Sequence, residues 1–390
     1  MGEDASALSG LETTTLEPPV RALLGEPTAA VVTDRWSCRP LGGGASEGIG
    51  LYRVTGSARV GRATHPWVLV CKVCAPANEI DPGAWDYPSR EPLAYGSGLL
   101  AALPGGIAAP RCLAVEAQPD GTARLWIEAV TDAHPGPWPL DRYALVARRL
   151  GRFNGAYLAG VPLPDQPWLS RGWLRDFVEP SGPALLELEN LAGPDGPPLL
   201  RQLYPSPIVA ELRRLWTERE RFLTALDRLP QTFCHHDAFR RNLLHQAGPE
   251  GEDLVAVDWA YAGRGAVGEE LGQLVVASLY FFEAAGIGPR DLAAACFAGY
   301  VAGLREAGWA GDERLVRLGF AADAALRTTV GLLRVILPLV AEPARRPVVE
   351  DRFGRPLEDV VAAWAELWPL QLGLADEARA LLSAGLLAGS

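Results

Sequence analysis

The sequence contains 390 residues, of which 48% are hydrophobic and 21% are charged, so it can bury a large core in two lobes or two domains. This composition excludes a largely disordered chain. A formal net charge of -11 argues against a general nucleic-acid binder, because such proteins need a basic surface.

The first ten residues, MGEDASALSG, are acidic and lack the basic and apolar regions of a signal peptide. The most apolar windows, 274–282 and 330–340, are too short for a membrane span or carry Arg334. The six cysteines show no disulfide framework, which suits a reducing compartment. We therefore predict a cytoplasmic protein without a membrane segment, in which residues 1–34 form an N-terminal extension.

Residues 35–130 contain short β-rich runs that are separated by Gly, Pro and Asp-Gly turns. The expected strands span residues 36–41, 50–60, 67–73, 111–116 and 124–130. One helix is expected among them, over residues 89–103, because Ser89 suits the N-cap and leucines recur behind it. These elements predict a first, β-rich lobe.

After about residue 135, apolar residues recur with the period of a helix. The expected helices span residues 140–157, 208–226, 268–285, 289–307, 314–340 and 357–372. The stretch 161–207 is rich in Pro and Gly and is interpreted as an insertion with short elements. Residues 131–390 are therefore predicted to form a second, larger and mainly helical lobe.

A glycine-rich turn and a single lysine follow one another in the first lobe. Residues 41–50 include five glycines, which allow backbone N–H groups to approach an anion closely. The chain has 36 basic residues, of which Lys72 alone is a lysine. A lysine that faces inward on a strand needs a negative partner, and the candidates are a nucleotide phosphate and Glu91.

The second half contains residue types that suit phosphoryl transfer. Asp237 lies five residues before Asn242, and a later apolar run ends at Asp258. Asp237 could accept a hydroxyl proton, while the oxygens of Asn242 and Asp258 are hard ligands for magnesium. Because magnesium shares its coordination shell with phosphates, the pattern predicts one site that joins both halves of the chain.

This combination of motifs resembles the aminoglycoside phosphotransferase and choline kinase-like family. Its residues are Lys72, Glu91, His235-x-Asp237-x-x-x-x-Asn242 and Val257-Asp258-Trp259. The resemblance implies an α+β, two-lobed protein-kinase-like fold, with an antiparallel sheet plus one helix in the small lobe. It also implies a kinase that uses ATP and Mg²⁺, with GTP left open, to phosphorylate a hydroxyl of a small molecule.

The family's residue roles carry over to the matching positions. Asp237 corresponds to the catalytic base or hydroxyl-orienting residue, Asn242 and Asp258 to metal ligands, Lys72 to the phosphate contact with Glu91 as its partner, and His235 to the brace of the catalytic loop. The nucleotide site is also expected to include Gly43, Gly44 and Ser46 of the turn, and the backbone of Glu128 and Val130 at a hinge.

The chain departs from the family pattern at several positions near this site. His236 stands where many relatives have Gly, and Glu270 stands where they have Asp, so an extra methylene shifts any brace that Glu270 makes. Arg240 and Arg241 could supply charge to the γ-phosphate or form structural salt bridges. The roles of these residues stay open at this point.

The acceptor pocket is expected between the catalytic loop and the helices after Asp258. Its candidate residues are Asp237, Trp259, Tyr261, Glu269, Glu270, Tyr280, Phe281, Glu283 and Asp323. The best acceptor is an aminoglycoside or another hydroxylated antibiotic; the alternative is a sugar or an amino alcohol. Two other classes stay open: a metallohydrolase built on Cys234, His235, His236 and His245, and a kinase-like binding module without catalysis.

Overall fold

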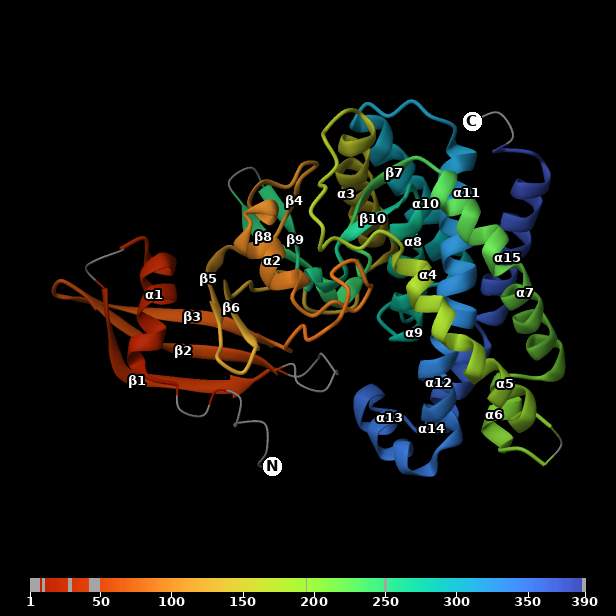
Figure 1. The fold of residues 1–390 in the computed structure, drawn as a ribbon, viewed down its shortest axis with the longest axis horizontal. Coiled ribbons are helices and arrows are strands. Elements are labelled where there is room, and N and C mark those ends of the chain that lie inside the picture. Colours follow the sequence, from red (N-terminus) through yellow and green to blue (C-terminus); the bar gives the residue numbers. More distant parts are fainter. Residues whose placement is uncertain are drawn as a thin grey trace.

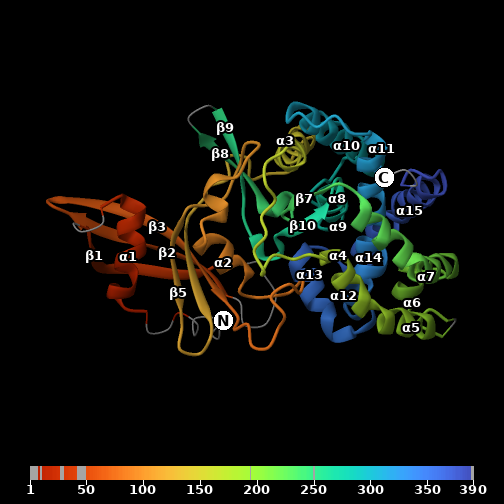
Figure 2. The ribbon, with the colours of Figure 1, turned by 45° about the horizontal axis from the view of Figure 1, so that its top comes forward.

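The structure is a computed structural model that describes residues 8, 11–26, 30–41, 50–193, 195–248 and 251–387. A sheet-containing lobe and a larger, mainly helical lobe lie side by side (Figures 1 and 2). The predicted α+β, two-lobed fold is therefore confirmed. The predicted nucleotide residues Gly43, Gly44 and Ser46 lie outside the described residues.

The first lobe is built on a five-stranded antiparallel sheet with the order β1-β2-β3-β6-β5. Its strands are β1 (Ala30–Pro40), β2 (Gly50–Val60), β3 (Ala63–Cys74), β5 (Cys112–Ala117) and β6 (Ala123–Glu128). Along β3, Leu69, Cys71 and Val73 are buried in the core on one face of the sheet. Because side chains alternate along a strand, Lys72 points to the opposite face.

Helix α1 (Thr13–Leu24) covers the outer face of this sheet (Figure 1). Its Leu16 and Val20 are fully buried in the same core as Leu69. Part of the segment that was predicted as an extension thus belongs to the core of the first lobe. The sequence hid this helix because Pro18 and Pro19 lie inside it, and proline usually interrupts a helical pattern.

The expected helix over residues 89–103 is two shorter elements, α2 (Arg90–Gly96) and the 3₁₀ turn η1 (Leu99–Ala102). The buried Arg90 guanidinium fixes α2 against the second lobe. It donates to the backbone oxygens of Trp168 at 2.8 Å and Ala260 at 2.9 Å. These bonds hold Glu91, the next residue, at the boundary between the lobes.

Two small sheets flank the motif residues of the second half of the chain. The strands are β4 (Ile107–Ala108), β7 (Gln231–Cys234), β8 (Leu243–Gly248), β9 (Gly251–Ala256) and β10 (Gly263–Ala266), which pair in the orders β4-β9-β8 and β10-β7. Strand β7 ends directly before His235, and β9 ends two residues before Asp258. The ends of these strands therefore place the catalytic loop and the second aspartate.

Helices surround these sheets. They are α3 (Leu140–Leu158), α4 (Trp173–Val178), α5 (Gly182–Leu191), α6 (Pro198–Leu203), α7 (Ser206–Arg228), α8 (Glu269–Gly272), α9 (Ser278–Tyr280), α10 (Pro289–Glu306), α11 (Glu313–Ala325), α12 (Leu332–Ala341), α13 (Arg346–Phe353), α14 (Leu357–Ala365) and α15 (Trp368–Ser383). Two of the expected long helices each contain a π-helical turn: η5 (Gln273–Ala277) joins α8 to α9, and η6 (Leu326–Gly331) joins α11 to α12. The expected helix 357–372 divides into α14 and α15.

The continuous helical stretch Glu313–Ala341 is long and apolar enough to span a membrane by length and composition. However, 67% of its most apolar window is buried inside the protein. It packs against α7 and α15. This environment is typical of a core helix.

Candidate active site

Lys72 meets two carboxylates where the two lobes join. Its Nζ lies 2.5 Å from Glu91 Oε2 and 2.6 Å from Asp258 Oδ1. The other Glu91 oxygen accepts a hydrogen bond from the backbone N–H of Trp259 at 3.1 Å. Strand β3, helix α2 and the segment after β9 thus converge on one ammonium group.

The charges in this group determine its proton affinities. Burial acts to lower the pKa of Lys72, but Asp258 and Glu91 outweigh it and hold that pKa well above its usual value. Burial likewise acts to raise the pKa of Asp258, and the neighbouring Lys72 reverses this effect and lowers it. Both groups are therefore charged at neutral pH.

His235 connects the catalytic loop to the end of β9. Burial lowers its pKa to about 4, so the imidazole is neutral at pH 7. Its Nε2–H donates to the backbone oxygen of Val257 at 2.9 Å, and its Nδ1 accepts from the Asp237 N–H at 3.2 Å. One neutral tautomer satisfies both bonds.

Asp237 lies in the loop after β7, and both of its carboxylate oxygens accept hydrogen bonds. Asn242 Nδ2 donates to Oδ2 at 2.7 Å, and Gln273 Nε2 donates to Oδ1 at 2.5 Å. Burial raises the pKa of Asp237 to about 8, and the nearby Asp258 carboxylate acts in the same direction. The carboxylate therefore has the proton affinity that a general base needs near neutral pH.

Asn242 and Asp258 could hold a divalent cation. The Asn242 amide nitrogen donates to the backbone oxygen of Asp237 at 3.0 Å as well as to its side chain, which leaves the amide oxygen as the ligand atom. The Asp258 backbone is left-handed, with φ 65°, a conformation that Asp tolerates better than most residues. These amide and carboxylate oxygens fit magnesium, which prefers hard oxygen ligands.

Glu270 supports the catalytic loop by accepting hydrogen bonds from its backbone. One of its carboxylate oxygens accepts hydrogen bonds from the backbone N–H groups of His235 and His236, the latter at 3.2 Å. Burial raises the pKa of Glu270 to about 7. The extra methylene of a glutamate therefore does not prevent this brace.

His236 occupies a left-handed backbone conformation, with φ 63°, which favours glycine. Its ring stacks on Trp173 with the centroids 5.5 Å apart and the planes 9° apart. Nε2–H donates to the backbone oxygen of Arg264 at 3.2 Å. These contacts offset the cost of the backbone conformation.

The metallohydrolase alternative requires that Cys234, His235, His236 and His245 form one metal-binding cluster. The structure separates them: His235 binds Val257, and His245 Nδ1 lies 3.2 Å from Glu252. Cys234 and His236 instead lie near Glu269, with ligand atoms within 4.8 Å of one another, and all three residues are buried. The four residues therefore do not form one cluster.

Arg240 and Arg241 make contacts within the protein. Arg240 is buried and pairs with Asp132 at 2.9 Å, which ties the catalytic loop to the connection between the lobes. Arg241 pairs with Glu283 at 2.5 Å. In this structure both arginines are therefore engaged in salt bridges, and Glu283 is the partner of one of them.

Most of the other predicted acceptor residues lie inside the second lobe. The buried ones are Trp259, Glu269, Glu270, Tyr280 and Asp323. Phe281 stacks on Phe239, and Tyr261 stacks on Trp85 with the ring centroids 5.7 Å apart. Burial of this kind counts against direct contact between these side chains and an acceptor.

The predicted hinge follows strand β6. The Glu128 carboxylate pairs with Arg111 at 2.7 Å, and its backbone N–H donates to the Arg111 oxygen at 3.1 Å. Val130 lies two residues beyond the end of β6 and is half-buried. The adenine contact expected of this backbone stays a prediction.

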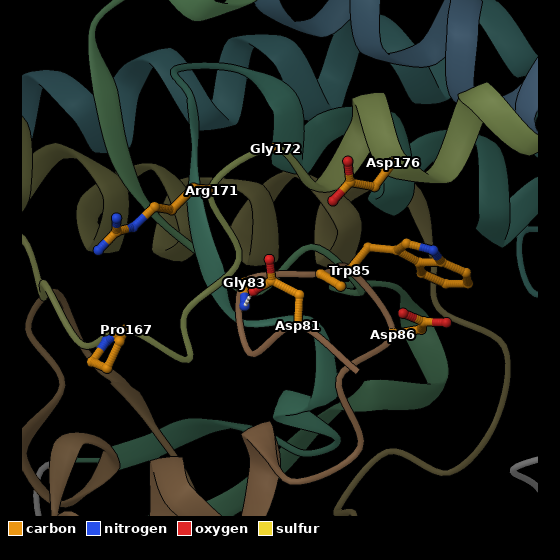
Figure 3. Close-up of a pocket in the computed structure, with 9 residues that line it drawn as sticks. Asp81, Gly83, Trp85, Asp86, Pro167, Arg171, Gly172 and Asp176 are labelled. Atoms are coloured by element: carbon orange, nitrogen blue, oxygen red, sulfur yellow. Dashed lines mark hydrogen bonds between the residues drawn. The ribbon is translucent and has the colours of Figure 1, made fainter. Parts of the chain in front are cut away.

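A cavity of about 670 Å³ opens beside Trp85 (Figure 3). Its lining residues are Asp81, Gly83, Ala84, Trp85, Asp86, Pro167, Arg171, Gly172 and Asp176. They come from the loop before α2, from the segment that leads into α4 and, for Asp176, from α4 itself, and none of these contains a motif. No sequence pattern therefore indicates this cavity, and the predicted acceptor residues do not line it.

Gln273 and Arg327 were also missed by the sequence analysis. Arg327 Nη1 donates to Gln273 Oε1 at 2.9 Å, and Gln273 in turn contacts Asp237. Each lies in an apolar helical window, where a polar residue is normally expected to face solvent. Both lie in π-helical turns, and no sequence pattern marks such a turn.

Residues 82–313 match the phosphotransferase enzyme family, APH, over more than half of the chain. The chain therefore belongs to this family, and the predicted enzyme class, a phosphotransferase of small molecules, is confirmed. No curated protein sequence matches the chain.

Several solved structures share the fold. The amicoumacin kinase hAmiN, in complex with AMP-PNP, Ca²⁺ and Ami, is 16% identical, covers 83% of this chain and 88% of its own, and has a TM-score of 0.51. The microcompartment-associated aminopropanol kinase is 15% identical, with coverages of 94% and 99% and a TM-score of 0.54. The Plasmodium vivax ethanolamine kinase is 12% identical, with coverages of 96% and 97% and a TM-score of 0.50.

Proposed function

We propose that this protein transfers the γ-phosphoryl group of ATP, with Mg²⁺, to a hydroxyl group of a small molecule. The observation that carries the proposal is the ion group at the joint of the lobes, where Lys72 lies between Glu91 and Asp258. A lysine, a divalent-cation site and a base of raised pKa are the parts that phosphoryl transfer needs.

Each residue has a role that follows from its chemistry. The Lys72 ammonium, which Glu91 holds in place, would bind phosphate oxygens, and Asn242 and Asp258 would hold the cation. A bound cation neutralises the charge that develops on the transferred group. Asp237 orients the acceptor hydroxyl and takes its proton, and it is ionised when the pH exceeds its pKa of about 8.

For the acceptor, we propose an aminoglycoside or another hydroxylated antibiotic that carries amino groups, with an amino alcohol as the second candidate. The cavity beside Trp85 supports an amine-bearing acceptor, because three carboxylates, those of Asp81, Asp86 and Asp176, line it against one cation, Arg171. Carboxylates attract an ammonium group. A neutral sugar would gain less from this lining.

We also propose a cytoplasmic location, where ATP is the phosphoryl donor, and no nucleic-acid or membrane partner. All six cysteines are free, which suits a reducing compartment. GTP remains a donor to be tested beside ATP.

The test is acceptor-dependent release of ADP from Mg-ATP by the purified protein. The panel comprises aminoglycosides, other hydroxylated antibiotics, amino alcohols and sugars, with GTP run in parallel and the Asp237→Asn variant as the control. We expect turnover with an amine-bearing acceptor and a product that gains one phosphate by mass spectrometry. Binding of Mg-ATP without turnover on any acceptor would instead support a binding module.

A further inference from the structure

Gln273 makes a contact with Asp237 that is not part of the recognised motif. Asn242, five residues after Asp237, donates to one carboxylate oxygen, whereas Gln273, 36 residues after Asp237, donates to the other. Its Nε2 lies 2.5 Å from Asp237 Oδ1, which is a short hydrogen bond. A separate element of the fold therefore restrains the carboxylate.

The orientation of the Gln273 amide is set by Arg327. Arg327 Nη1 donates to Gln273 Oε1 at 2.9 Å, so the amide nitrogen has to face Asp237. Arg327 itself donates to the backbone oxygen of His236 at 2.8 Å and to Asp323 Oδ1 at 3.2 Å. The chain of contacts runs from a buried ion pair through one amide to the carboxylate.

Aromatic contacts hold the same arginine from another side. The Arg327 guanidinium lies 3.9 Å from the centroid of the Trp173 ring, and this ring stacks on His236. Arg327 is only 2% exposed. Burial of a guanidinium and a carboxylate costs free energy, and apolar side chains would pack the same space without that cost. The arrangement therefore calls for an explanation beyond packing.

Both residues depend on π-helical turns. Gln273 is the first residue of η5 and Arg327 is the second residue of η6. Such turns are rare and occur frequently at functional sites, because the inserted residue redirects the side chains around it. Two of them converge here on one carboxylate.

We propose that Gln273, held by Arg327, is a positioning residue that aims the Asp237 carboxylate at the acceptor hydroxyl. The proposal rests on the kinase function proposed above. The terminal torsion of an aspartate is broad, so one bond from Asn242 leaves the carboxylate free to turn. The second bond removes that freedom before the acceptor arrives.

The test uses two isosteric substitutions. Gln273→Met removes the donor, and Gln273→Glu keeps an acceptor for Arg327 but presents a carboxylate to Asp237. We expect kcat to fall about 10-fold in the first variant and about 10²-fold in the second, because a misaimed base loses proximity and orientation. The KM for Mg-ATP should stay within about twofold, since Lys72 and Asp258 make the proposed nucleotide contacts.

The matched control is Gln231→Met. Gln231 is a half-buried glutamine at the opposite end of β7, and its Nε2 donates to the backbone oxygens of Leu226 and Leu229. This variant should lower the melting temperature without lowering kcat. A loss of kcat in the Gln273 variants with a parental melting temperature and KM supports positioning.

Three outcomes overturn the proposal. Parental kcat in both Gln273 variants of an active enzyme overturns positioning and leaves the proposed function standing. A loss of kcat that Gln231→Met reproduces at a similar melting temperature shows a general effect of stability and also overturns positioning. A parent without turnover on any acceptor overturns the proposed function, and positioning with it.

Discussion

The two halves of the site are held by different forces. On the side of the first lobe, Lys72 lies 2.5 Å from Glu91 and 2.6 Å from Asp258, so opposite charges hold the group together. On the side of the catalytic loop, Asp237 accepts hydrogen bonds from the neutral amides of Asn242 and Gln273.

Under the proposed function, this difference follows from what each half would bind. Phosphates bring negative charge, so an ammonium and carboxylates that pair with one another in the ligand-free protein can exchange partners when a nucleotide enters. An acceptor hydroxyl is neutral and has to lose a proton. A cation bound directly to Asp237 would lower its proton affinity, whereas neutral donors orient the carboxylate and burial still raises its pKa to about 8.

The largest effect should come from removing charge on the phosphate side. Asp258→Ala removes the proposed metal ligand and one partner of Lys72 together. We expect loss of magnesium-dependent ATP binding and a fall in kcat/KM of more than about 10²-fold. The reason is that magnesium is normally bound by a carboxylate and by the nucleotide phosphates together. Calorimetry with and without magnesium measures the binding. Equal Mg-ATP affinity in variant and parent would remove Asp258 from the site.

The next largest effect should come from a change at the catalytic loop that leaves the ion group around Lys72 intact. Asp237→Asn should lower kcat by about 10² or more, the usual scale of a lost general base. ATP affinity should stay within several-fold, because the proposed role of Asp237 is to take the acceptor proton and not to bind the nucleotide. Glu306→Gln, which removes an exposed ion pair with Arg148, is the control for a change from carboxylate to amide. Unchanged turnover in Asp237→Asn would refute its role.

Lys72→Arg tests whether activity requires the shape of the lysine side chain as well as its positive charge. One Nζ contacts two carboxylates within 2.6 Å, and the strand neighbours Leu51 and Leu125 flank the lysine in register. The longer, planar guanidinium cannot reproduce both contacts, so we expect kcat/KM for ATP to fall about 10-fold or more with normal folding.

Glu91→Gln should cost less than Lys72→Arg, because Asp258 still holds the ammonium. Thermal melting checks the fold of both variants. Kinetics of Lys72→Arg that equal those of the parent would show that any cation at this position serves.

The sequence supplied the residues of the site but not all of their supports. Short spacing from Asp237 to Asn242 and an apolar strand before Asp258 are local patterns, and the predicted strand 50–60 coincides with β2. Lys72 was identified because it is the only lysine, and the structure places it against Glu91 and Asp258. These features can be recognised in the sequence because each depends on neighbouring residues or, for Lys72, on the composition of the chain.

The features that the sequence did not reveal depend on long-range packing. Helix α1 carries Pro18 and Pro19, yet the sheet gives its apolar face a partner and stabilises it. Gln273 and Arg327 contact the catalytic loop from π-helical turns, which no local pattern marks. The cavity beside Trp85 is formed by the loop before α2 and by residues 167–176, which are distant from it in the sequence. A local pattern contains none of this information.

The smallest expected effect concerns the contribution of His236, in the catalytic loop, to the free energy of unfolding. Burial, aided by the Arg327 charge, lowers the pKa of His236 well below its usual value, so the folded protein holds this imidazole neutral. In the unfolded chain the ring titrates near pH 6.5. Its contribution to stability is therefore fully present above that pH and is lost as the pH falls below it, because only the unfolded state takes up the proton.

His236→Asn removes this titration and keeps a residue that tolerates the φ of 63°. As the pH falls from 7 to 5, the unfolding free energy of the parent should decrease relative to that of the variant, because only the unfolded parent takes up a proton at residue 236. Urea denaturation of the ligand-free proteins at pH 7 and pH 5 measures it. The buried acids are common to both proteins and cancel in the difference. A difference that does not change with pH would mean that His236 takes up its proton equally in the folded and unfolded states, and that the neutral half of the site does not depend on a neutral His236.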